Sequence, residues 1–283
     1  MYRKIKNIVK NLFKKDRVGE EFVPYKKSFR ICEIDFELWI ADSTGKKWYD
    51  HDYWNDAPEL QMLNKLVERG DHVLEFGLHH GFISTFTCIK VGNKGKYIGV
   101  ELLPKASIYT MANLKLNEIG PNCKIINAAG GDKAGFISFF NEENANGYVK
   151  NNNNGFQIEQ ITGDSLLERL DNRVDCLKID VEGFEIKVLE GCKKILDLYP
   201  NIDLEIHTES IKSYEGEITR IFELINIEKY DAYYFWNPGT QYIDPTSHKL
   251  KGFSVKDIPM SGIINLFLFS KEKRPVEMVL EKE

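Results

Sequence analysis

From residue 72 onward, short apolar runs alternate along this chain with apolar residues at helical spacing. The apolar runs predict strands over 72–76, 96–101, 123–127, 174–180, 202–207, 231–236 and 263–269. The segments with helical spacing predict helices over 82–91, 104–118, 184–198 and 216–227. Such alternation is typical of a parallel sheet with helices on both faces. We therefore expect an α/β fold, a Rossmann-like doubly wound sheet.

Two further elements are expected before this domain. Segment 1–17 is rich in Lys and Arg, with apolar residues at helical spacing, which predicts a basic amphipathic helix. Such a helix either lies on an anionic membrane surface or packs on the body of the protein. Near-alternation over 28–41 predicts a β-hairpin. The resulting division is a basic arm (1–17), an accessory hairpin (18–56), the α/β domain (57–273) and a C-terminal tail (274–283).

Two polar segments interrupt the pattern. Segment 141–155 is rich in Asn and Gly, which favours a mobile loop. Segment 237–261, rich in Pro and Gly, lies between the last two predicted strands and is expected to be a covering loop.

Composition narrows the class of protein. The formal charge of -5 and the pI near 5.8 argue against a general nucleic-acid binder. The five scattered cysteines lack the spacing of a zinc site or disulfide framework, so we expect reduced, mostly buried thiols and a cytoplasmic location. No signal peptide or membrane-spanning run stands out, which leaves peripheral contact with the inner face of the membrane through segment 1–17 as one option. The sequence leaves open whether the protein forms a homodimer.

The run 73–81 predicts a ligand-binding corner, since an apolar strand enters a glycine-bearing turn and then a helix. Gly77 and Gly81 are four residues apart, with His79 where the dinucleotide fingerprint G-x-G-x-x-G has its second glycine. This spacing disfavours a nicotinamide enzyme. Glu101, at the end of the next predicted strand, suits ribose hydroxyls in either class.

Polar residues also follow two later strands. Asp180 and Glu182 end the run 177–183, and His207 ends the run 203–207. Ligands of open α/β sheets bind beyond the carboxyl ends of the strands, so these three side chains are candidates for a catalytic cluster. His207 would act as a general base or would form, with both carboxylates, an oxygen-and-nitrogen site for a divalent metal. The alternative for Asp180 and Glu182 is a helix cap beside an exposed acid.

These motifs resemble those of the FkbM-type methyltransferases, a branch of the class I S-adenosylmethionine-dependent enzymes. The resemblance covers roughly residues 59–271. It rests on 75–81 (EFGLHHG), 127–132, 162–166 and above all 178–183 (KIDVEG) with Gly191 downstream. It implies a sheet of seven strands whose last strand, 263–269, is antiparallel.

The resemblance also implies positions for S-adenosylmethionine. The turn that would hold its methionine end consists of Glu75, Phe76, Gly77, Leu78, His79 and Gly81. Glu101, followed by Leu102, would bind the ribose, Asn127 and Ala128 would line the adenine, and Asp180 would lie under the sulfonium. The family usually has acid-x-Gly-Ala-Asn in the turn, where this sequence has Leu78 and His79 as the last two residues.

The function implied is O-methylation of a sugar hydroxyl in a surface glycan or its precursor. Asp180, Glu182 and His207 would carry the catalysis, with or without a divalent metal bound to the same three residues. One alternative is an NAD-dependent nucleotide-sugar dehydrogenase, which shares the ribose-binding acid. Another is a non-catalytic binding module that retains the fold, suggested by His79 in place of Asn.

Overall fold

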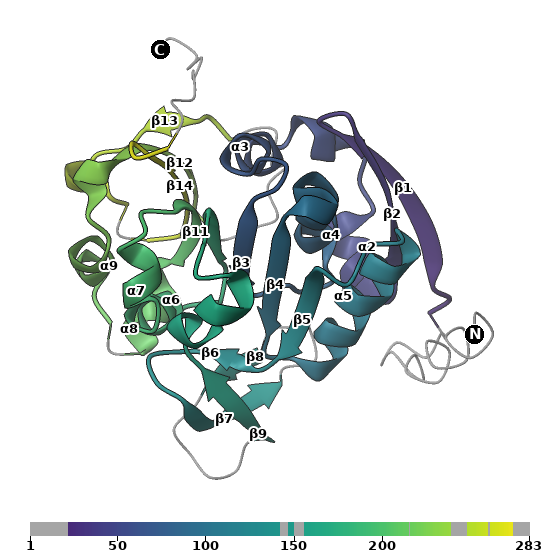
Figure 1. The fold of residues 1–283 in the computed structure, drawn as a ribbon, viewed down its shortest axis with the longest axis horizontal. Coiled ribbons are helices and arrows are strands. Elements are labelled where there is room, and N and C mark those ends of the chain that lie inside the picture. Colours follow the sequence, from purple (N-terminus) through teal and green to yellow (C-terminus); the bar gives the residue numbers. More distant parts are fainter. Residues whose placement is uncertain are drawn as a thin grey trace.

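The main sheet has the predicted doubly wound arrangement. The computed structural model describes residues 22–141, 147–149, 156–214, 216–238, 248–259 and 261–273. The strands are β3 (His72–Phe76), β4 (Lys96–Glu101), β5 (Cys123–Asn127), β10 (Cys176–Ile179), β11 (Asn201–His207), β12 (Tyr230–Asn237), β13 (Lys251–Gly252) and β14 (Ile263–Ser270). Their order is β13-β12-β14-β11-β10-β3-β4-β5, and β14 runs antiparallel to both neighbours (Figure 1). The seven expected strands are present, and the short β13 adds an eighth at one edge.

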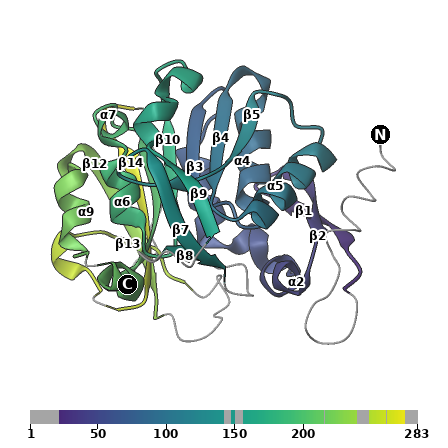
Figure 2. The ribbon, with the colours of Figure 1, turned by 90° about the horizontal axis from the view of Figure 1, so that it is seen from below.

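Helices cover both faces of this sheet (Figures 1 and 2). One face carries α3 (Pro58–Leu66), α4 (Phe82–Val91) and α5 (Pro104–Leu116), and the other carries α6 (Glu185–Glu190), α7 (Lys193–Leu196), α9 (Thr219–Leu224) and the 3-10 segment η3 (Gly163–Leu170). The shorter segments are η2 (Gly92–Lys94), α8 (Thr208–Ser213), η4 (Ile227–Lys229) and η6 (Val255–Asp257). Side chains alternate between two core clusters, because successive strand residues point to opposite faces: Val73 joins the α4 side and Leu74 the α6 side.

The single helix expected over 184–198 is wrong, because α6 ends at Glu190 and α7 starts at Lys193. The break falls at Gly191, where an added Cβ would lie 1.9 Å from the carbonyl oxygen of Gly131. This close backbone approach requires glycine, which is also a poor residue for continuing a helix.

A second sheet, which the sequence did not predict, follows β5. It consists of β6 (Ala129–Gly130), β7 (Gly135–Asn141), β8 (Gly147–Val149) and β9 (Phe156–Ile161), in the order β6-β9-β7-β8. Phe139 and Ile158 pack against Leu103 and Ala106 at the start of α5. The mobile loop expected over 141–155 is therefore partly wrong, since 147–149 form a strand. Residues 142–146 and 150–155 lie outside the described residues.

The accessory hairpin is confirmed as β1 (Tyr25–Ile31) and β2 (Ile34–Ile40), followed by α2 (Ser43–Tyr49) and η1 (Tyr53–Asp56). It covers the outer side of α4 and α5, with the ring of Phe36 lying 5.6 Å from that of Phe82. The backbone N–H of Trp39 donates to Asn113 Oδ1 at 2.8 Å. The arm 1–17 and the tail 274–283 lie outside the described residues. Among the described helices, none has the length and apolar character needed to cross a bilayer.

Lys178 of β10 is buried directly below the carboxyl edge of the sheet. Its ammonium lies 3.1 Å from Glu59 Oε1 of α3 and 3.3 Å from Asp203 Oδ2 of β11. Glu75, on the other neighbouring strand, is 1% exposed and accepts a hydrogen bond of 2.6 Å from Tyr97 Oη. Burial raises the pKa of Glu75 to about 7, although Lys178 and Tyr97 oppose the shift. Three carboxyl groups thus surround one buried cation.

Replacing Phe36 by Ala is expected to lower the free energy of unfolding by about 3–4 kcal/mol, because it leaves a cavity between the hairpin and α4. Phe36 is 4% exposed. Urea denaturation measures the change, and Val23→Ala, at a side chain that is 76% exposed, is the control. A loss below about 1 kcal/mol for Phe36→Ala would mean that the hairpin does not belong to the cooperative core.

Replacing Glu75 by Gln should stabilise the fold increasingly as the pH rises. The folded pKa of Glu75 lies above its ordinary value of 4.5, so ionisation in the folded state costs stability progressively between pH 4.5 and about 7. Below that range the carboxyl is protonated in both states, and the cost is absent. Denaturation at pH 5 and pH 8 should show a gain for Glu75→Gln that reaches about 2–3 kcal/mol at the higher pH. The exposed Glu168→Gln is the control, and an equal gain for Glu75→Gln at both pH values would contradict a raised pKa.

Candidate functional site

Strand register brings the polar ends of β10 and β11 together. The two strands are parallel, and Lys178 pairs with Asp203 and Ile179 with Leu204. The next position on each strand is Asp180 and Glu205. Successive side chains of a strand point to opposite faces of the sheet. One face of β11 therefore carries Asp203, Glu205 and His207, while Leu204 and Ile206 are buried on the other.

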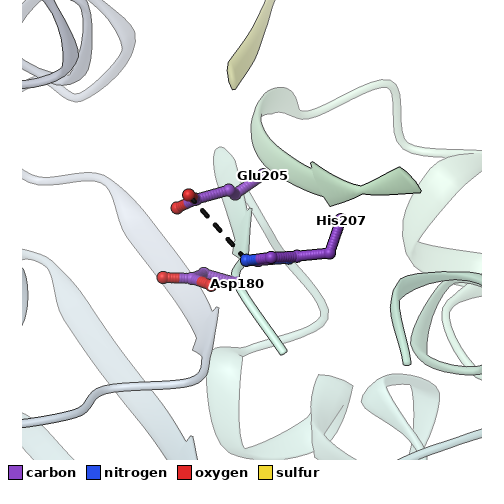
Figure 3. A group of neighbouring side chains, drawn as sticks. All are labelled: Asp180, Glu205 and His207. Atoms are coloured by element: carbon purple, nitrogen blue, oxygen red, sulfur yellow. Dashed lines mark ion pairs between the residues drawn. The ribbon is translucent and has the colours of Figure 1, made fainter. Parts of the chain in front are cut away.

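Asp180, Glu205 and His207 form a compact cluster at this edge (Figure 3). One ligand atom from each side chain lies within 4.8 Å of the other two, and His207 Nε2 is 3.9 Å from Glu205 Oε1. Burial raises the pKa of Glu205 well above its usual range, and the charge of Asp180 adds to the shift. Two carboxylates and one imidazole nitrogen therefore converge on a single point.

His207 is fixed from behind by a buried carboxylate. Its Nδ1 lies 2.8 Å from Glu185 Oε1, and Glu185 is fully buried and also accepts the N–H of Gly183. Burial lowers the pKa of His207, but Glu185, Glu205 and Glu182 outweigh this effect and raise it well above its ordinary value. The contact with Glu185 places the Nδ1 proton toward Glu185 and directs Nε2 toward Glu205 and Asp180 (Figure 3).

Glu182 lies at the rim of the cluster. Its Oε2 is 3.4 Å from His207 Nε2, and its side chain is 44% exposed. The structure therefore brings together all three residues that the sequence singled out, but Glu205, not Glu182, completes the group with mutually close ligand atoms. The signal for Glu205 was available in the period-two pattern of Asp203, Glu205 and His207.

The glycine turn after β3 has the backbone that the sequence predicted. Gly77 and Gly81 have φ of 84° and 77°, values that favour glycine. A Cβ on Gly77 would lie 1.6 Å from the carbonyl oxygen of Asp180, so the turn packs directly on the end of β10. Gly81 is the N-cap of α4 and provides no side-chain cap, which leaves the first N–H groups of this helix open to a ligand such as a carboxylate.

Glu101 ties this turn to the start of α5. Its Oε2 accepts the N–H groups of Leu78 and His79 at 2.8 and 3.1 Å, and its Oε1 accepts that of Leu103 at 2.7 Å. Glu101, which the family resemblance assigns to the ribose, thus fixes the backbone of the glycine turn and of the start of α5. Asn127 Nδ2 donates to the carbonyl oxygens of Glu101 and Leu102, and Ala128 is fully buried beside them. Phe76, the remaining residue assigned to the turn, is buried in the core.

The accessory segment also contacts the glycine turn, which the sequence did not predict. Asp42, the N-cap of α2, contacts His80 Nε2 through Oδ1 at 2.8 Å and Lys105 Nζ through Oδ2 at 2.9 Å. At the other end of α2, Tyr49 Oη lies 2.5 Å from His79 Nδ1. Helix α2 is therefore attached at both ends to the dipeptide His79-His80.

His79 is neutral in this environment. Burial lowers the pKa of His79 to about 3, and the neighbouring ring of His80 acts in the same direction. Burial also raises the pKa of Tyr49 well above its ordinary value, with further contributions from Asp180, Glu59 and Glu75. Tyr49 is thus a protonated phenol close to the carboxyl ends of β3 and β10.

Several solved structures are similar to this chain at low sequence identity. Solved structures with a similar arrangement include a precorrin-6y C5,15-methyltransferase from Geobacter metallireducens, with 13% identity, 75% of this chain and 87% of that chain covered, and a TM-score of 0.42. A SAM-dependent methyltransferase from Aquifex aeolicus has 10% identity, with 80% and 97% covered and a TM-score of 0.42. An O-methyltransferase from Bacillus cereus in complex with SAH has 13% identity, with 74% and 77% covered and a TM-score of 0.39. A search of curated protein sequences finds no match.

The decisive match is at the level of a sequence family. Residues 75–236, more than half of the chain, match the family model described as "Methyltransferase FkbM domain". This range starts at Glu75 in the glycine turn and includes both Asp180 and His207. The chain belongs to the FkbM methyltransferase family, and the expected class of S-adenosylmethionine-dependent enzyme is confirmed.

Proposed function

We propose that this methyltransferase transfers its methyl group to a hydroxyl oxygen, and that a divalent cation held by Asp180, Glu205 and His207 activates that hydroxyl. The proposal rests on the convergence of these three side chains at the carboxyl ends of β10 and β11. S-adenosylmethionine supplies the electrophilic methyl group. An alcohol must lose its proton when the oxygen–carbon bond forms, so the protein needs a group that favours that loss.

The ligand atoms suit Mg²⁺ or Mn²⁺. Both ions favour carboxylate oxygens, and Mn²⁺ also accepts an imidazole nitrogen. An ion about 2.1 Å from each ligand would place adjacent ligand atoms about 3.0 Å apart, so the cluster would contract from the 3.9 Å between His207 Nε2 and Glu205 Oε1 when an ion binds. The carboxylate of Glu185 behind His207 is the partner that metal-binding histidines usually have. A bound cation would also balance the excess of carboxylates around His207.

His207 is less suited to the role of general base. Carboxylates lie near both ring nitrogens, with Glu185 at Nδ1 and Glu182 and Glu205 at Nε2. Without a cation this arrangement favours the imidazolium, and a bound cation would take the Nε2 lone pair in place of the proton. In neither state does His207 have a free lone pair to accept a proton. A divalent cation would lower the pKa of the hydroxyl instead. Glu182, at the exposed rim, can then take the proton from the oxygen and release it to water.

A sugar is the acceptor class that we favour. Trp236 is 44% exposed and Trp48 is 41% exposed, and both are large apolar side chains at the surface. Trp236 is on the same level of the sheet as the end of β11, because Ile264 pairs with both Ile206 and Trp236. Exposed aromatic faces bind the apolar faces of sugar rings while leaving the hydroxyls free. The nucleotide-sugar dehydrogenase and the non-catalytic module have no support from the family match.

The ligand set predicts different effects for two neighbouring glutamates. Glu205→Gln should weaken Mn²⁺ binding at least about tenfold, because it removes a charged ligand. Glu182→Gln should leave Mn²⁺ affinity within about threefold of the wild type and lower kcat instead, because this residue lies at the rim. Electron paramagnetic resonance of free Mn²⁺ gives the affinities, and calorimetry with S-adenosylhomocysteine checks that each variant retains its cofactor site. Equal Mn²⁺ affinities for the wild type and Glu205→Gln would exclude this metal site.

The acceptor class is tested with methyl-labelled S-adenosylmethionine and a panel of sugars and sugar nucleotides. We expect Mg²⁺-dependent formation of a methyl ether, stable to mild alkali, which rules out an ester. Chelation should stop transfer without displacing the cofactor. Label that appears on nitrogen or carboxylate acceptors and not on any hydroxyl would refute the proposed reaction.

A further inference from the structure

A buried polar atom at the glycine turn, His79 Nε2, has no hydrogen-bond partner among the described residues. Leaving a buried polar atom unpaired costs stability, so such atoms usually have a ligand or a water to meet. Whether His79 Nε2 is a donor or an acceptor depends on where the ring carries its proton.

The contact with Tyr49 bears on this question. The Tyr49 hydroxyl is protonated and lies 2.5 Å from His79 Nδ1, so it is able to donate to this nitrogen. With Tyr49 as the donor, Nδ1 of the neutral His79 is the acceptor and its single ring proton is on Nε2. The turn would then present an N–H donor.

We infer that Tyr49 and His79 make the accessory segment part of the cofactor site. His79 Nε2–H binds the α-carboxylate of the methionine end of S-adenosylmethionine, and Tyr49 is the positioning residue that keeps the proton on Nε2. The uncapped N–H groups at the start of α4 are further donors for this carboxylate. This inference depends on the methyl donor alone and not on the proposed acceptor or cation.

The position of α2 supports the inference. Its two attachments, Asp42 to His80 and Tyr49 to His79, both end on the turn and not on the sheet. Gly45, between them, lets α2 approach closely, since a Cβ there would lie 3.0 Å from His80 Cδ2. His79 has φ of 51°, an uncommon conformation that these contacts and the Glu101 bond to its N–H hold in place. The replacement of the family's usual Asn by His79 then has a reason: only the longer ring reaches Tyr49 and still offers a second nitrogen.

The experiment compares two ligands that differ in the methionine end. S-adenosylhomocysteine carries the amino-carboxylate, whereas 5′-methylthioadenosine lacks it and keeps the adenosine and the thioether. Calorimetric titration of the full chain should show that Tyr49→Phe weakens S-adenosylhomocysteine binding about tenfold and leaves 5′-methylthioadenosine binding within about twofold. Tyr25→Phe is the matched control, because it removes another tyrosine hydroxyl of the accessory segment, which lies 2.5 Å from Asp50.

A second variant tests whether Tyr49 acts through His79. His79→Ala should weaken S-adenosylhomocysteine at least as much as Tyr49→Phe, and the double variant should bind no more weakly than His79→Ala alone. Equal losses for both ligands in Tyr49→Phe, or a similar loss in Tyr25→Phe, would mean that the effect comes from a loosened accessory segment, and the inference would be wrong. Unchanged S-adenosylhomocysteine binding in Tyr49→Phe would also overturn it. A wild-type chain that binds neither ligand would refute the cofactor assignment itself.

Discussion

The buried ammonium of Lys178 is the interaction on which the arrangement of this site depends. A charge in the protein interior is stable only when it is paired, and Lys178 is paired with Glu59 of α3 and Asp203 of β11. These contacts hold β10, β11 and α3 together two residue pairs below Asp180 and Glu205. The ion pairs of Lys178 therefore fix the positions of the two strand ends that carry Asp180 and Glu205. Removal of Lys178 would leave Asp203 fully buried without a cation.

The charge balance changes from the base of the site to its edge. At the base, Lys178 offsets nearby carboxyl groups and Glu75 is driven toward its neutral form. At the edge, the carboxyl groups of Asp180, Glu182, Glu185 and Glu205 surround the single ring of His207. Such a surplus of carboxyl groups suits a site that receives cationic ligands, because a cation favours their ionised form. The sulfonium of the methyl donor and a divalent metal are both of this kind.

Much of the fold follows from the sequence, because the central strands are buried on both faces and read as continuous apolar runs. Strands β3, β4 and β5 and helix α4 have the predicted bounds. The break at Gly191 depends on a contact with Gly131 far away in the chain, which no local pattern reveals. The sheet β6-β9-β7-β8 was missed because β6 and β8 have only two and three residues, and because the sequence between β7 and β9 is rich in Asn and Gly.

The site was predictable where strand ends determine it and unpredictable where tertiary contacts do. Asp180 and His207 follow from the rule that ligands bind beyond the carboxyl ends of parallel strands. Tyr49 lies outside the matched family range, in a segment that looked like an accessory piece, and only the fold brings it to His79.

A departure from a family pattern can therefore indicate a new partner within the chain. Taken alone, His79 in place of Asn suggested, as one alternative, a non-catalytic binding module that retains the fold. In the folded chain Nδ1 of the same residue contacts the Tyr49 hydroxyl, and its second nitrogen has no hydrogen-bond partner among the described residues. Because that nitrogen is buried, it costs free energy unless a ligand meets it. The substitution thus favours a cofactor site completed by the accessory segment over a site that has been lost.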